Sequence, residues 1–309
     1  MNTAFSKLLD THIGTVFARQ LLFADFIKTK QEPSIDLEKG TVDFGNGIVC
    51  TIQLLGTQVD ADNTWLWAWS EANSDLFHQS TFKAPFPEAL LQDAKEIKAF
   101  GGSQEIDPLS HPKIVLELSS VPLVPDEFNG DHIACAAAGI LNTAYWRDTR
   151  DEGVVYYLVK NPAPEIMGPY TVPHILNTIE QITSYFNTDD KVMVESFLTQ
   201  QGYSIQWQDI MPSDQADHDE EEEEEGETEE GFRLTAHRGT EEITALFDLD
   251  GILTEIEAHG FEGEENYQET EENSNDLDAD NLLGQWNDYA DADDEFPPRM
   301  PPSNRQKLH

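Results

Sequence analysis

Hydrophobic residues recur along the first two thirds of the chain with two different spacings, and each spacing predicts a different kind of element. In residues 4–28 apolar side chains recur at three- and four-residue steps, which predicts an amphipathic helix that packs against a core. Shorter apolar runs separated by glycine-containing turns follow this helix and predict β-strands. These runs span residues 34–37, 41–44 and 47–55.

Tryptophan occupies every second position in the next run, residues 64–70. Alternate residues of a strand point to the same face, so Trp65, Trp67 and Trp69 are expected to share one face of a sheet. Leu66 and Ala68 are apolar as well and lie on the opposite face. A strand that is apolar on both faces is typical of the centre of a sheet.

Helical and strand patterns alternate beyond the tryptophans. Helices are expected at residues 87–100, 131–146, 172–186 and 189–198, and strands at residues 113–118, 153–160, 203–207, 232–236, 243–247 and 252–256. The chain is therefore expected to be an α+β protein: an N-terminal helix with an antiparallel sheet and packed helices, then a small helix–helix–sheet module.

Composition divides the chain further. The segment Asn161-Pro162-Ala163-Pro164 cannot continue a helix or a strand ladder, which predicts a boundary between a first domain (1–161) and a small module (165–260). An acidic insertion at residues 212–231 is expected to be a disordered loop of that module. Residues 262–309 have no hydrophobic periodicity sufficient for a core and are expected to form a disordered acidic tail.

Charge narrows the classes of partner. The chain has 60 Asp+Glu and 18 Lys+Arg, a formal net charge of −42. Residues 1–210 carry 28 of the acids and 13 of the bases, so the last third holds most of the excess. This density of negative charge repels nucleic acids and anionic membranes, and it favours a basic protein partner.

The N-terminus lacks the pattern of a signal peptide, and no apolar stretch has the length of a membrane span. These features predict a cytoplasmic protein, in which Cys50 and Cys135 are reduced, buried thiols. The oligomeric state does not follow from the sequence.

Two chemical motifs overlap at residues 246–257. Asp248-Leu249-Asp250-Gly251 resembles the nucleophile motif of haloacid-dehalogenase-type phosphatases, and Asp248, Asp250 and Glu257 fit part of a calcium loop. Against the phosphatase interpretation, the chain lacks the later strands that such an enzyme needs. Against the calcium loop, its first position is Leu246, which has no side-chain oxygen. A β-hairpin turn at Asp250-Gly251 explains the same residues. We therefore predict no catalytic residue, no metal site and no cofactor.

Two apolar groups remain as candidate binding sites. The first is a ligand pocket lined by Trp65, Trp67, Trp69, Trp146 and Tyr157, for which the alternative is a packed core. The second is a segment of the tail whose apolar residues lie at helical spacing and would fold on binding a basic groove, for which the alternative is a few incidental apolar residues. Its residues are Leu282, Leu283, Trp286 and Tyr289.

The tryptophan strand, the helix that ends at Gly101-Gly102 and the alanine-rich helix together resemble an uncharacterised bacterial family, a domain of unknown function marked by a Trp-x-Trp-Ala-Trp strand. The resemblance covers residues 1–160 and implies no activity. We therefore expect a non-enzymatic acidic interaction protein, such as an inhibitor or an immunity-type factor, with a small-ligand binder or enzyme at the tryptophan face as the alternative.

Overall fold

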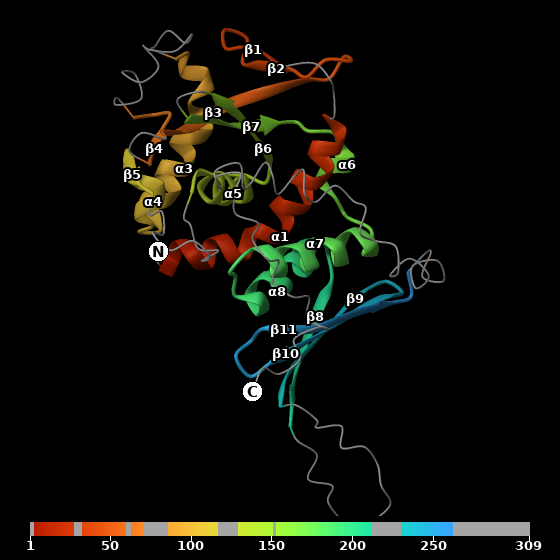
Figure 1. Ribbon diagram of the computed structural model, residues 1–309. Helices are drawn as coiled ribbons and strands as arrows, with labels where there is room; N and C mark the ends of the chain where they lie inside the picture. Colours follow the sequence, from red (N-terminus) through yellow and green to blue (C-terminus); the bar gives the residue numbers. More distant parts are fainter. Residues whose placement is uncertain are drawn as a thin grey trace, which may run out of the picture. The chain divides into compact units, whose positions relative to one another are not determined.

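The computed structural model describes residues 3–27, 33–59, 63–70, 86–116, 129–150, 153–211 and 230–261. Contacts divide these residues into two compact units, which meet in sequence between Pro169 and Tyr170. Both units combine helices with antiparallel sheets (Figure 1), so the α+β prediction is confirmed.

Unit 1 is built on a seven-stranded antiparallel sheet. Its strands are β1 (Ser34–Asp36), β2 (Thr41–Asp43), β3 (Val49–Val59), β4 (Thr64–Trp67), β5 (Lys113–Val115), β6 (Ala144–Arg150) and β7 (Gly153–Lys160). Strands β1 to β5 pair in sequence order, and β3 also pairs with β7, which pairs with β6. Strands β4 and β7 are buried along almost their whole length, and β3 is buried mainly in its second half, as in the centre of a sheet.

The helices of unit 1 are α1 (Thr3–Phe26), η2 (Glu88–Leu90), α3 (Gln92–Ser103), α4 (Asp107–Ser110), α5 (Gly130–Ile140) and α6 (Pro164–Met167). Helix α5 contacts β3, β6 and β7 on one side and α1 on the other (Figure 1). Its small residues make this double contact possible: Ala134 to Ala138 are fully buried, and a Cβ at Gly139 would clash with the side chain of His12.

One expected helix is shorter than its pattern suggests. The helix expected at 131–146 ends at Ile140, and Tyr145 and Trp146 belong to strand β6. Asn142 adopts a positive φ of 48°, which ends the helix and turns the chain back toward β7. Tyr145 and Trp146 are strand-favouring aromatic residues, and pairing with β7 decides their conformation.

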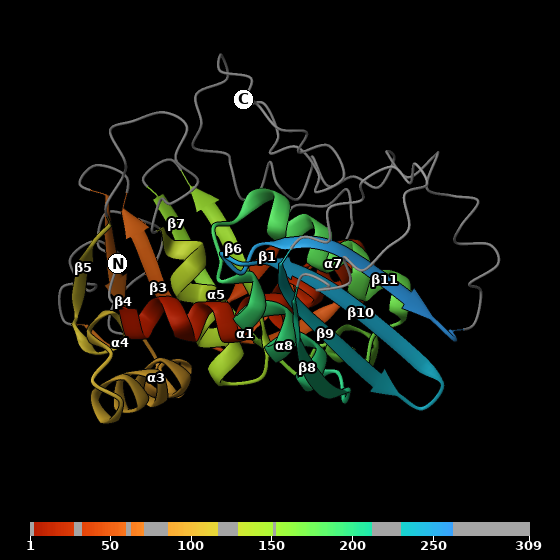
Figure 2. The same ribbon diagram turned by 90° about the horizontal axis from the view of Figure 1, so that it is seen from below.

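Unit 2 places two helices against a four-stranded sheet (Figures 1 and 2). The helices are α7 (Val172–Tyr185) and α8 (Asp190–Gln200), and the strands are β8 (Ser204–Ile210), β9 (Gly231–Arg238), β10 (Glu241–Asp248) and β11 (Leu253–His259). The four strands form a meander in the order β11-β10-β9-β8. Ile210 pairs with Gly231, so the acidic run connects two neighbouring strands at one end of this sheet.

The sheet of unit 2 has one apolar and one polar face. Ile243, Ala245 and Phe247 of β10 are buried, and the residues between them are partly exposed. This alternation is that of a sheet with helices on one side only. Side chains on the open face are mainly polar or charged, and they include Arg233, His237, Glu242, Glu255 and Glu257.

Candidate functional site

The tryptophans of the sequence motif lie at β4 and just beyond it. Trp65 and Trp67 are fully buried strand residues, whereas Trp69 lies in the following turn and is half-buried. The ring of Trp65 lies 5.1 Å from that of Tyr156, and the Trp67 ring stacks on Trp69 at 6.4 Å. Among the described residues these contacts are those of a packed aromatic core, and a ligand pocket on this face stays a prediction.

The three indole N–H groups differ in their hydrogen bonding. Nε1 of Trp67 donates to the carbonyl oxygen of Pro108 at 3.0 Å. Nε1 of Trp65 and Nε1 of Trp69 are buried and have no acceptor among the residues that the structure describes. A buried donor without a partner costs about 1–3 kcal/mol, so hydrophobic packing alone does not explain these two groups.

The other two pocket candidates lie elsewhere. Trp146 stacks on Tyr157 at 5.4 Å and meets the ring of Phe44 edge-on at 5.3 Å. Tyr156 and Tyr157 are consecutive residues of β7, so their side chains point to opposite faces of the sheet. Trp65 and Trp67 therefore lie on the Tyr156 side, and Trp146 lies with Tyr157. Trp69 stacks on Trp67 and also packs against the core cluster that contains Tyr157.

A buried charged group lies on the Tyr156 side of the sheet. Asp131, the second residue of α5, accepts hydrogen bonds from Arg147 Nη1 at 2.9 Å, Tyr145 Oη at 3.3 Å and Tyr156 Oη at 3.3 Å. The side chain of Asp131 is 5% exposed and that of Arg147 is 12% exposed. The Asn129 side chain caps the helix just before this residue by accepting from the N–H groups of Asp131 and His132.

Burial dominates the electrostatics of this cluster. It raises the pKa of Asp131, and the guanidinium of Arg147 acts in the opposite direction. Burial and the adjacent Asp131 carboxylate also raise the pKa of Tyr145 well above its ordinary value. The four side chains satisfy one another, which is the arrangement of a structural ion pair. This cluster could not be predicted from spacing along the chain, because its members come from α5, β6 and β7.

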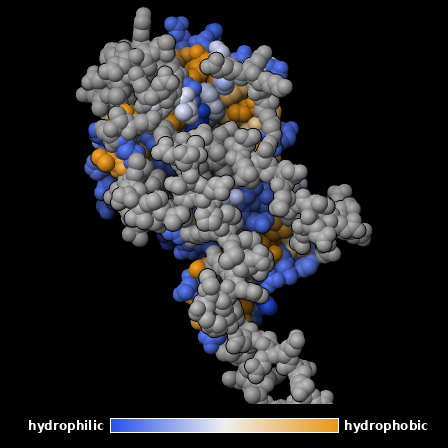
Figure 3. All heavy atoms as spheres, viewed as in Figure 1, coloured by the Kyte–Doolittle hydropathy of each residue, from blue (hydrophilic) through white to orange (hydrophobic). Residues whose placement is uncertain are grey.

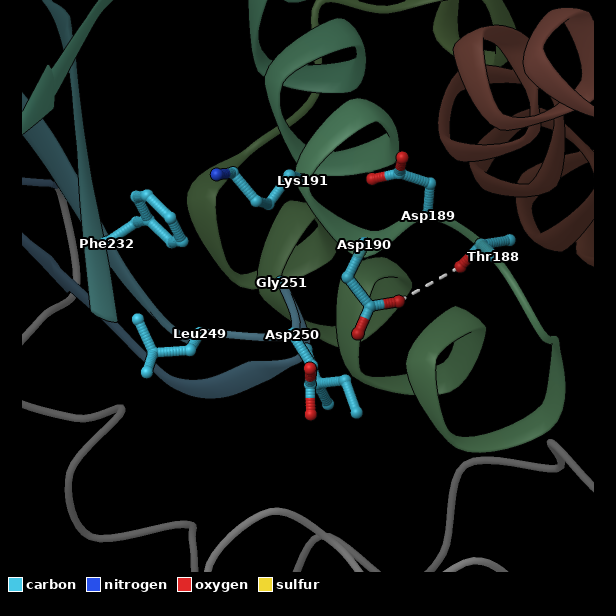
Figure 4. Close-up of a pocket in the computed structure, with 9 residues that line it drawn as sticks. Thr188, Asp189, Asp190, Lys191, Phe232, Leu249, Asp250 and Gly251 are labelled. Atoms are coloured by element: carbon cyan, nitrogen blue, oxygen red, sulfur yellow. Dashed lines mark hydrogen bonds between the residues drawn. The ribbon is translucent and has the colours of Figure 1, made fainter. Parts of the chain in front are cut away.

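Unit 2 contains an open pocket of about 390 Å³ between the N-terminus of α8 and the turn that joins β10 to β11 (Figure 4). Its apolar lining comes from Phe232, Leu249 and Ile252. Leu249 is 62% exposed and Ile252 is 36% exposed, so apolar surface faces solvent at the mouth. Thr188, Asp189, Asp190, Lys191, Asp250 and Gly251 complete the lining.

Hydrogen bonds hold two of these acids in place. Asp189 caps α8 by accepting from the N–H of Val192 at 3.1 Å. Asp190 accepts from Thr188 Oγ1 at 3.1 Å, drawn in Figure 4, and from the N–H of Leu253 at 3.0 Å, which joins the helix to β11. Asp250 is exposed at the tip of the turn. The rim of the pocket is thus acidic.

Lys191 contributes the positive charge of this lining, and it extends toward Phe232 (Figure 4). Its Nζ lies 3.3 Å from the ring centroid of Phe232 and 5.0 Å from that of Trp207. Trp207 is 38% exposed, and its Nε1 donates to Glu195 at 3.1 Å. Spacing along the chain could not predict this group, because β8, β9 and α8 bring its members together.

The turn itself accounts for the acids of the phosphatase-like motif. The carbonyl of Asp248 accepts from the N–H of Gly251 at 3.0 Å, and its carboxylate accepts from the N–H of Ile252 at 2.9 Å. Gly251 has a φ of +82°, which glycine adopts without strain. Strands β10 and β11 pair on either side, as the hairpin prediction requires.

Some predictions lie outside the described residues. These are the tail segment of Leu282, Leu283, Trp286 and Tyr289, and most of the acidic insertion. Within the described ranges, no group of three or more His, Cys, Asp or Glu side chains is arranged to hold a metal ion. No helix of those ranges combines the length and the apolar character needed to cross a membrane.

Comparison with known proteins identifies a family without an assigned activity. No curated protein and no solved structure matches the chain. A model of a family of unknown function, DUF6882, matches residues 6–162, which include most of α1, the whole seven-stranded sheet and α5. This match confirms the resemblance to a domain of unknown function that the sequence predicts over residues 1–160. The chain belongs to the family of unknown function DUF6882.

Proposed function

We propose that this chain is a non-enzymatic interaction protein that binds a basic protein partner, as an inhibitor or an immunity-type factor does. The observation that carries this proposal is the formal net charge of −42. A field of this strength accelerates encounter with a basic surface and repels nucleic acids. In the part of the surface that Figure 3 colours, hydrophilic residues surround small hydrophobic patches.

A binding titration with a defined basic probe tests this proposal. The probe is a fluorescein-labelled peptide of roughly twelve alternating Arg and Leu residues, and the readout is fluorescence anisotropy with the full chain. We expect affinity to fall about tenfold or more between about 50 and 500 mM salt, because added salt screens the attraction. Deleting residues 262–309 is expected to weaken binding at low salt, since that segment carries much of the charge.

A peptide in which Glu replaces Arg is the control and is expected not to bind. Binding of the Arg peptide that does not change with salt would overturn the proposal, as would equal binding of the two peptides. An unchanged affinity after the deletion would contradict the contribution assigned to the tail.

The second candidate function is binding of a small ligand at the tryptophan face. The buried Nε1 groups of Trp65 and Trp69, for which the described ranges contain no acceptor, favour it, because an acceptor oxygen of a ligand would satisfy them. A panel of metabolites that carry carboxylate or carbonyl groups, screened by melting temperature, tests this function. A ligand that stabilises the full chain and not its Trp65→Phe variant supports it, and a panel without stabilising members leaves the tryptophans as core residues.

A further inference from the structure

Lys191 lies at a position where the helix dipole disfavours a cation, although acids line the pocket beside it. It is the second residue of α8, where the helix dipole presents positive charge. Glu195, one turn further along the helix, accepts from Trp207 Nε1. Across the described part of the chain, Lys191 has no carboxylate within ion-pair distance, and its ammonium instead contacts the rings of Phe232 and Trp207. Cation–π attraction holds this group against the dipole.

The surroundings of Lys191 combine exposed apolar groups with acids. Leu249, Ile252 and Trp207 are three of the large hydrophobic residues that remain exposed among those described. We call them, with Phe232 and Lys191, the Lys191 surface. Asp189, Asp190 and Asp250 line the pocket next to it. An apolar floor with an acidic rim complements a segment that carries both basic and aliphatic side chains.

We propose that the Lys191 surface is the docking site for a basic segment of the partner protein, and that a cationic side chain of this segment replaces Lys191 over Phe232 and Trp207. This inference rests on the proposed function and locates it on the folded part of the chain. Displacing Lys191 breaks no ion pair between described residues, because its ammonium contacts the rings of Phe232 and Trp207 instead. An arginine is a suitable replacement, since its planar guanidinium stacks on aromatic rings while the acidic rim supplies carboxylates.

The apolar part of the Lys191 surface indicates which other residue types the partner segment carries. Leu249 at the tip of the turn and Ile252 beside it would cover aliphatic side chains next to the cation. A partner segment with charged side chains alone would gain no binding free energy from Leu249 and Ile252. The partner segment is therefore expected to alternate basic and aliphatic residues, and a run of lysines alone is expected to bind this surface more weakly.

The test uses the Arg/Leu peptide, the full chain and substitutions with matched controls. Lys191→Gln removes the competing cation and is expected to tighten binding by about fivefold. Lys95→Gln removes the same charge from the surface of unit 1, where Lys95 pairs with Glu88, and is the control for a change of net charge. Its effect is expected to be smaller than about 1.5-fold, because it acts only through the long-range field.

A second pair of variants tests the apolar floor. Leu249→Ser is expected to weaken binding by about threefold, and Val115→Ser, at a residue of unit 1 that is 68% exposed, is expected to leave it unchanged. Urea unfolding checks that all four variants fold. Equal affinities for Lys191→Gln and Lys95→Gln, or for Leu249→Ser and Val115→Ser, would overturn the inference.

Three further outcomes separate the possible explanations. Absence of salt-dependent binding to the Arg/Leu peptide in the unsubstituted chain refutes the proposed function itself. Salt-dependent binding that neither Lys191→Gln nor Leu249→Ser alters leaves the proposed function standing and refutes only this docking site. Conversion of a dimer to a monomer by Leu249→Ser, seen in sedimentation velocity, would mean that a second copy of the chain covers the surface and would also refute the inference.

Discussion

Asp131 in unit 1 and Lys191 in unit 2 occupy equivalent positions with opposite consequences. Each is the second residue of a helix that begins after a capping Asn or Asp, and each lies against aromatic rings. Asp131 is buried, has three hydrogen-bond donors and carries the charge that a helix N-terminus favours. Lys191 lies at an open pocket and carries the charge that this end disfavours. The first arrangement stabilises a fold, whereas the second leaves a charged group available for exchange with a partner.

Arg238 shows that structural charges are not confined to unit 1. It belongs to unit 2 and lies 4.5 Å from the ring of Tyr203, so it too is a cation beside an aromatic side chain. Unlike Lys191, it pairs with Glu241 at 2.7 Å and donates to the carbonyl oxygens of Gln201 and Tyr170. Hydrogen-bond satisfaction, rather than location in the chain, therefore separates structural charges from available ones.

Removal of the Asp131 carboxylate is expected to have the largest effect. Asp131→Ala leaves Arg147 and two tyrosine hydroxyls buried without their acceptor, and we expect a loss of about 3–5 kcal/mol of unfolding free energy. Urea unfolding followed by tryptophan fluorescence measures it, since Trp65, Trp67, Trp69 and Trp146 all lie in unit 1.

Two variants control this experiment. Glu96→Ala, on the exposed side of α3, is expected to change stability by less than about 0.5 kcal/mol. Asp131→Asn keeps an acceptor oxygen and is expected to lose less than Asp131→Ala, which makes it the variant of choice if the alanine variant does not fold. A loss for Asp131→Ala no greater than that for Glu96→Ala would show that the cluster is not structural.

The packing around Asp131 gives the second largest expected effect. A Cβ added at Gly130 would lie 2.7 Å from Gln58 Oε1 and 2.8 Å from the ring of Tyr156, so Gly130→Ala is expected to cost about 1–3 kcal/mol. Gly102→Ala is the matched control, since nothing lies within 4 Å of its Cβ position and alanine favours the helix. If both glycines tolerate alanine equally in thermal unfolding, the surroundings of Asp131 are not tightly packed, and the contrast with the open pocket at Lys191 is weakened.

The ion pair of Arg238 is expected to have a smaller effect that depends on pH. Hydrogen bonds from Arg238 and then Tyr203 lower the pKa of Glu241 below its ordinary value of 4.5. Its contribution to stability is therefore present above pH 4.5 and is lost as pH falls through the lowered pKa of the folded state. We expect Glu241→Gln to be about 1 kcal/mol less stable than the unsubstituted chain at pH 7. This difference in unfolding free energy is expected to disappear on acidification. A difference that is independent of pH in urea unfolding would contradict this assignment.

Hydrophobic spacing predicted the fold better than it predicted the charged clusters. The period of residues 4–28 located α1, and the turn residues Asp250-Gly251 located the β10–β11 hairpin, because both signals are local. The helix expected at 131–146 was too long, since pairing of Tyr145 and Trp146 with β7 overrides the local pattern after Asn142.

The candidate sites depend on contacts between distant elements. Alternation in β4 correctly indicated that Trp65 and Trp67 share a face, but it could not show that Trp146 and Tyr157 lie on another. Asp131 meets Arg147 and Tyr156 through the pairing of β6 with β7. Lys191 meets Phe232 and Trp207 only once α8 packs on the sheet. Neither cluster has a spacing along the chain from which it could be recognised.

The smallest effect on stability is expected for a substitution of Lys191. Its size tests whether Lys191, unlike Asp131, contributes little to the stability of the fold. Lys191→Met removes a cation–π contact worth about 0.5–1 kcal/mol at an exposed site, but it also removes an unfavourable interaction with the helix dipole of about 0.3–1 kcal/mol. Methionine also keeps much of the aliphatic stem that packs near Gly251. The change in unfolding free energy is thus expected to stay within about 0.5 kcal/mol of zero in urea unfolding at pH 7. A loss of 2 kcal/mol or more, on the order expected for an integral core contact, would place Lys191 with Asp131 among the structural charges and would remove the physical basis for its displacement by a partner.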